Sequence, residues 1–85
     1  SASTKALMFG VCELDEKGEQ LIRTEGIVFI DVDSSNGAIV SGDFITVSNN
    51  GKALRSTNSE WVIGKALEDE VDGKVKVRLD FRFKQ

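Results

Sequence analysis

The chain has no histidine and a single cysteine, Cys12. A catalytic triad needs a proton acceptor that titrates near neutrality, and without histidine the usual base is missing. One cysteine forms no disulfide within the chain, and the apolar run around Cys12 favours a buried, unreactive thiol. We therefore expect no enzyme activity, no catalytic residue, no metal site and no cofactor.

Long hydrophobic runs are also missing, and positive charge is in deficit. No stretch approaches the roughly 18 apolar residues of a membrane span, and the N-terminus lacks the basic and apolar regions of a signal peptide. The net charge of -3 disfavours overall attraction to nucleic acid or to an anionic membrane. We expect neither partner, and a protein kept in a reducing cytoplasm unless it leaves as part of a particle.

Proline is absent, whereas eight glycines fall at fairly regular breaks between short runs of β-forming residues. No run of useful length has helical periodicity. The pattern predicts an all-β fold, namely a small single-domain β-barrel or β-sandwich over residues 6–85 that follows a flexible N-terminal arm over residues 1–5. Without proline, edge strands must be protected by charge, bulges or partner contacts.

Seven strands are expected. They cover residues 6–13, 20–23, 27–32, 44–47, 52–55, 60–67 and 75–84. The first is almost continuously apolar, which predicts a strand covered on both sides, with Gly10 at a bulge or close approach. Turns are expected at residues 15–18, at Asn36-Gly37, at residues 49–51 and at Asp72-Gly73, where glycine and its polar neighbours favour tight reversals.

Two strands have distinctive faces. In residues 27–32, Ile27 and Phe29 alternate with other apolar residues, so one face fills the core and the other needs a second sheet or another molecule to cover it. The last strand has an apolar face and a mainly basic one. Its apolar face carries Val75, Val77, Leu79, Phe81 and Phe83, and the opposite face carries Lys74, Lys76, Arg78, Asp80, Arg82 and Lys84.

The basic face raises the question of nucleic acid, because it holds five of the eleven Lys and Arg residues. Single-strand binders interleave exposed aromatic side chains with basic ones, and Phe81 and Phe83 lie on the other face. A solvated or ion-paired strand face is the simpler interpretation. The run from Asp31 to Gly42 has some acidic spacing of a calcium loop, but its sixth residue is Asn36 and its twelfth is Gly42, which breaks the pattern.

A succession of short glycine-bounded motifs runs from residue 26 to residue 79. It comprises Gly26-Ile-Val-Phe-Ile-Asp-Val32, Asn36-Gly37, Gly42-Asp-Phe-Ile-Thr-Val-Ser48, Gly51-Lys-Ala53, Val62-Ile-Gly-Lys-Ala-Leu-Glu-Asp69, Gly73 and Val75-Lys-Val-Arg-Leu79. This succession resembles that of capsid-decoration (cement) proteins of tailed phages. It is also similar to β modules of phage tail fibres.

The resemblance implies a β-tulip-like barrel and a structural role in a virion. The chain would be made in the host bacterial cytoplasm, bind the major capsid protein on the outer surface of an assembled capsid, and stabilise the shell as a homo-oligomer, commonly a trimer. The polar start and the end on a strand predict a complete small protein, which places the tail-fibre module second. A small adaptor or single-strand binder is a third alternative.

Candidate contact residues follow from the same resemblance and from the two-faced strand. Ile27, Phe29 and Trp61 are candidates for contacts between subunits, although Trp61 suits a core position equally well. The N-terminal segment is the candidate for docking on the capsid by ordering when it binds. It comprises Ser1, Ala2, Ser3, Thr4, Lys5, Ala6 and Leu7.

Overall fold

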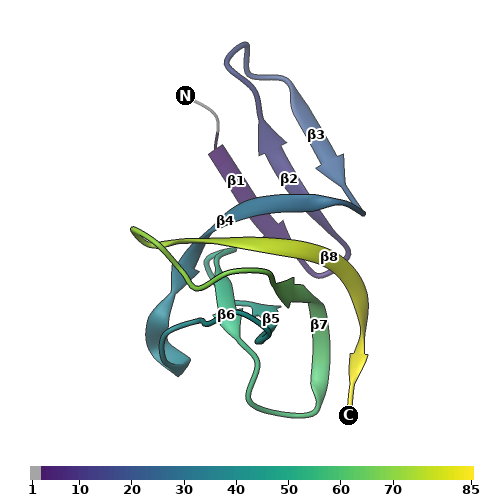
Figure 1. Ribbon diagram of the computed structural model, residues 1–85. Helices are drawn as coiled ribbons and strands as arrows, with labels where there is room; N and C mark the ends of the chain where they lie inside the picture. Colours follow the sequence, from purple (N-terminus) through teal and green to yellow (C-terminus); the bar gives the residue numbers. More distant parts are fainter. Residues whose placement is uncertain (1–2) are drawn as a thin grey trace.

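The computed structural model describes residues 3–85 and contains two sheets in one all-β domain, as expected (Figure 1). The elements in chain order are β1 (Ser3–Leu7), β2 (Gly10–Leu14), β3 (Gln20–Arg23), β4 (Ile27–Asp33), a 3-10 turn η1 (Ser34–Asn36), β5 (Phe44–Val47), β6 (Ala53–Arg55), β7 (Glu60–Ala66) and β8 (Lys74–Lys84). No helix within residues 3–85 is long and apolar enough to cross a membrane.

The second sheet is a closed barrel with the strand order β4-β6-β5-β7-β8, and β8 pairs back onto β4. Only β4 and β6 run parallel, and their short ladder joins Val32 to Ala53 and Asp33 to Leu54. The other pairs are antiparallel. Closure leaves each barrel strand with a neighbour on both sides, which removes the edges that would otherwise attract other strands.

In β4 and most of β8, alternate side chains point into the core, as the sequence pattern predicts. Val28 and Ile30 of β4 and Val75 and Val77 of β8 point inward and are buried. Leu79, Ile45, Ile63, Ala66, Ala53 and Ile39 complete the barrel part of the core. Phe81 is half-buried against this cluster, whereas Phe83, at the end of the predicted apolar face of β8, is 59% exposed.

The turn at Asp72-Gly73 has the geometry that the sequence indicates, and a close approach of two strands requires glycine at residue 64. Asp72 and Gly73 have φ values of 52° and 75°, which suit the tight hairpin between β7 and β8. A Cβ at Gly64 would collide with the main-chain oxygen of Arg78 on β8. Glycine is therefore required there for the two strands to approach, next to a register irregularity between Val62 and Gly64.

The N-terminal sheet has the order β1-β2-β3, which corrects the prediction of one strand over residues 6–13. That apolar run is instead a hairpin, whose exposed turn consists of Met8 and Phe9. Ala6 and Val11 are opposite each other across the hairpin, and both are buried in the core shared with the barrel. The run looked continuous because each strand contributes inward apolar residues and the turn between them is apolar too.

The predicted flexible arm over residues 1–5 is also corrected. Ser3, Thr4 and Lys5 belong to β1 and pair with Leu14, Glu13 and Cys12 of β2, while residues 1 and 2 lie outside the described part. The main-chain N–H of Ala6 donates to the carbonyl of Gly51 in the barrel at 2.8 Å. Main-chain hydrogen bonds form a ladder whatever the side chains are, so a small polar composition did not prevent strand formation.

Candidate binding surfaces

Ten large hydrophobic side chains are exposed among residues 3–85. They are Met8, Phe9, Leu21, Ile22, Ile27, Phe29, Val40, Trp61, Val71 and Phe83. Single exposed apolar residues are normal in soluble proteins, whereas groups of them mark contact surfaces. Most of these ten fall into three groups, which lie on different elements.

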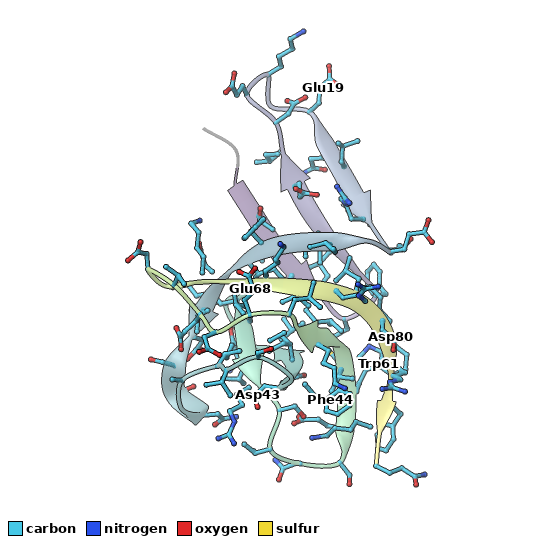
Figure 2. All side chains as sticks on the ribbon, in the orientation of Figure 1. Glu19, Asp43, Phe44, Trp61, Glu68 and Asp80 are labelled. Carbon is cyan, nitrogen blue, oxygen red and sulfur yellow. The ribbon has the colours of Figure 1, made fainter. Side chains whose placement is uncertain are left out.

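The first group, called the Trp61 surface, consists of Met8, Phe9, Trp61 and Phe83. Trp61 on β7 is directly opposite Phe83 on β8, and its indole Nε1–H donates to the carbonyl of Met8 at 2.5 Å. Phe9, which follows Met8 in the β1–β2 turn, is 72% exposed. Three aromatic side chains thus meet the solvent where the N-terminal hairpin is attached to the barrel, and Figure 2 shows Trp61 beside β8. Exposed aromatic residues of this kind are typical anchors of protein interfaces.

The second group, called the β4 face, consists of Ile27 and Phe29 with their cross-strand neighbours Arg78 and Lys76. Phe29 is 60% exposed, so the N-terminal sheet does not cover it. The Lys76 ammonium lies 5.9 Å from the centre of the Phe29 ring. An ion pair between Lys74 and Asp31, with 2.9 Å between Nζ and Oδ1, borders the face. Lys76 is also ion-paired with Glu68 at 3.6 Å, so carboxylates offset two of the three cations beside this face. The face therefore combines apolar contact area with a largely neutralised polar rim and suits an apolar partner.

The third group lies on the N-terminal sheet. All four residues of β3 are exposed, and Leu21 and Ile22 point to opposite faces of the sheet because they are adjacent in a strand. Only β2 is a neighbour of β3. The strand therefore presents both apolar side chains and an unoccupied main-chain edge.

An arrangement that the sequence analysis did not anticipate surrounds Phe44 of β5. Its ring centre lies 5.0 Å from the Lys65 ammonium, 5.4 Å from the Arg82 guanidinium carbon and 5.6 Å from the Lys84 ammonium. The basic face of β8 thus does meet an aromatic ring, but the ring comes from β5, two strands away in the barrel. The sequence alone does not predict this cluster, because the cluster depends on the order of the strands in the barrel.

Acidic groups offset these cations. Arg82 is ion-paired with Asp80 at 3.4 Å, and Lys84 is opposite Glu60 in the β7–β8 ladder. Cation–π attraction and cross-strand charge pairing account for the cluster as part of the barrel wall. The expectation that the basic face is solvated and paired agrees with these contacts, and nucleic-acid binding remains a minor alternative.

A polar depression of about 360 Å³ lies between η1 and the β5–β6 turn. Its lining includes Asp33, Ser35, Ser48, Asn49 and Asn50. The Asp33 carboxylate accepts a hydrogen bond from the main-chain N–H of Ser35 at 3.0 Å, and this bond lowers the pKa of Asp33 below its ordinary value. Within residues 3–85, no three Asp, Glu, Cys or His side chains gather closely enough to hold a metal ion.

The structure separates the predicted contact residues. Ile27 and Phe29 share the β4 face, whereas Trp61 belongs to a different surface. Ser3, Thr4, Lys5, Ala6 and Leu7 form β1, where Ala6 is buried and Lys5 is exposed, so they are not a free docking segment. Ser1 and Ala2 lie outside the described residues. Met8 and Phe9 were missed because their turn was predicted as part of a strand, and Phe83 was assigned only to the apolar face of the last strand.

No protein-family model matches this chain, and no similar protein was found among curated proteins or among solved structures.

Proposed function

We propose that this chain is a non-enzymatic structural protein of a virion, which binds the outer surface of an assembled phage capsid and stabilises it as a homo-oligomer. The proposal joins the motif succession from Gly26 to Leu79 to one structural observation. A closed barrel of this small size presents the Trp61 surface and the β4 face to solvent, each with large apolar side chains. Such surfaces favour stable contacts with protein and support a binding role.

The proposed mechanism is preferential binding. If the chain binds the expanded shell and not the separate capsid subunits, binding lowers the free energy of the shell alone. At a free concentration one hundred times the Kd, each occupied site adds about 2.7 kcal/mol to the stability of the shell. The barrel supports this role because its closed hydrogen bonding holds the contact residues in fixed positions.

In this proposal, one apolar surface contacts the capsid and the other contacts neighbouring subunits. The β4 face, where Ile27 and Phe29 are exposed, meets an apolar patch of the major capsid protein. The Trp61 surface joins subunits through its three exposed aromatic residues, Phe9, Trp61 and Phe83. A trimer is the expected oligomer, and the mass of the purified chain in solution measures it.

The test uses empty, expanded heads prepared without this chain. Purified protein should sediment with these heads in a saturable way and raise the temperature at which they break open. Phe29→Ser should weaken head binding about tenfold or more, because a central aromatic contact is worth over 1 kcal/mol. Val71→Ser is the matched control, since Val71 is equally exposed but lies outside the three apolar groups.

Two results would oppose the proposal. If the unaltered chain neither sediments with heads nor changes their heat resistance, a capsid role is rejected. If Phe29→Ser and Val71→Ser bind equally well, the β4 face is not the capsid contact. Recovery of the chain with purified tails, and not with heads, would assign it to a tail fibre or another appendage.

A further inference from the structure

The free edge of β3 is the part of the described backbone least protected against pairing with another strand. β3 is the outermost strand of the N-terminal sheet, whereas β1 at the opposite edge is bonded to the barrel through Ala6 and Gly51. All four β3 residues are exposed, and Leu21 and Ile22 are 60% and 54% exposed. Figure 1 shows β3 at the margin of the molecule, with only its last residues next to the start of β4.

Two common protective devices, a bulge and a proline, are missing from this short edge strand of four residues. The β2–β3 register is regular, without a bulge, and the chain contains no proline. Arg23 is the only charged residue in β3, and its guanidinium is ion-paired with Glu13 on β2 at 3.6 Å. An exposed apolar edge strand with no bulge, proline or lysine is a template for another strand.

From this edge we infer that two copies of the chain pair through β3, antiparallel and across a two-fold axis, to form a continuous six-stranded sheet. The occupant is a second copy because the strand is complementary to itself. An axis perpendicular to the sheet keeps each face on the same side, so Glu19, Leu21 and Arg23 of one copy meet the same three residues of the other.

Charge selects one register. When Leu21 is directly opposite Leu21 of the second copy, Glu19 is opposite Arg23 in both directions, and Gln20 is opposite Ile22. Centring the pair on Ile22 instead would place Glu19 opposite Glu25, which are like charges. Opposite charges directly across a ladder stabilise antiparallel pairs and like charges destabilise them, so the register centred on Leu21 is favoured.

This inference goes beyond the proposed function and does not depend on a capsid. The contact uses neither the β4 face nor the Trp61 surface, so it would join chains of neighbouring oligomers both on a shell and in solution. Figure 2 places Glu19 at the end of the N-terminal sheet that is far from the barrel.

Cysteine cross-linking of the free chain tests the contact. Leu21→Cys and Ile22→Cys are compared in a Cys12→Ala background, since Cys12 is the only native thiol. Directly opposite residues have Cβ atoms about 5 Å apart and form disulfides, whereas residue 22 lies about 8 Å from its own copy in the favoured register. Under mild oxidation, Leu21→Cys should form a covalent dimer at least about tenfold faster than Ile22→Cys.

A charge exchange provides the second measurement, read as the cross-linking rate of Leu21→Cys. Glu19→Arg puts two guanidinium groups opposite each other and should slow cross-linking, and adding Arg23→Glu should restore it. Equal rates for the two cysteine variants, faster linking of Ile22→Cys, no dimer at all, or no restoration would each overturn the inference. Because no heads are present, these outcomes are separate from those that test capsid binding.

Discussion

The barrel and the N-terminal sheet differ in how the main-chain hydrogen-bonding groups of their strands are paired. Barrel strands have neighbours on both sides and enclose a core of buried aliphatic residues. The N-terminal sheet has a free outer strand and contributes only Ala6 and Val11 to that core. In this chain of 85 residues, the barrel therefore encloses most of the core, whereas the N-terminal sheet leaves main-chain and apolar groups exposed at β3.

The largest expected difference between the two regions comes from the same substitution made in each. Ile63→Ala in β7 removes a fully buried side chain and should cost about 2 to 5 kcal/mol of unfolding free energy. Ile22→Ala in β3 alters an exposed side chain and should cost about 0.5 kcal/mol. Urea unfolding of both variants measures the contrast. Similar losses for the two would show that β3 is as important to stability as the barrel.

The same contrast explains which parts of the fold could be predicted from sequence. In β4 and in β8 up to Leu79, one face is buried, so the period of two identifies inward residues such as Ile30 and Val77. The turn at Asp72-Gly73 was predictable because positive φ favours these residue types. Local chemistry determines such features, and they need no knowledge of distant contacts.

The features that sequence did not predict depend on contacts between distant segments. Met8 and Phe9 form an exposed turn even though they are apolar, and the Met8 carbonyl accepts a hydrogen bond from Trp61, 53 positions away. Phe44 gathers three cations only because β5 and β8 flank β7. The surfaces proposed for binding therefore follow from strand order, which a single sequence with short strands leaves open.

A smaller effect on stability is expected from the hydrogen bond that connects the two regions. Trp61→Phe removes the hydrogen bond to the Met8 carbonyl while keeping an aromatic ring, and should cost about 1 kcal/mol. Amide hydrogen exchange should quicken in β1 and β2 and change little in the β4–β8 ladder. Phe83→Leu is the control, because Phe83 neighbours Trp61 but no side-chain hydrogen bond is lost with it. Uniformly faster exchange across the barrel would contradict a local role for this connection.

The smallest expected effect concerns Asp33, where β4 ends and η1 begins. Its carboxylate accepts the Ser35 N–H, and this hydrogen bond, together with a smaller contribution from the nearby Lys52 ammonium, holds the pKa of Asp33 below the ordinary value of 3.8. Because the folded pKa is the lower one, this stabilisation is fully present above pH 3.8 and is lost as the pH falls through the folded value.

Asp33→Asn should therefore lower the stability slightly at neutral pH and reduce the difference between the urea unfolding midpoints measured at neutral and at acid pH. Since Asp33 lies at the parallel β4–β6 junction, a barrel feature, the acid-sensitive amides should be those of η1 and β6, and not those of the N-terminal sheet. An unchanged acid response in Asp33→Asn would assign the acid sensitivity of the fold to other carboxylates.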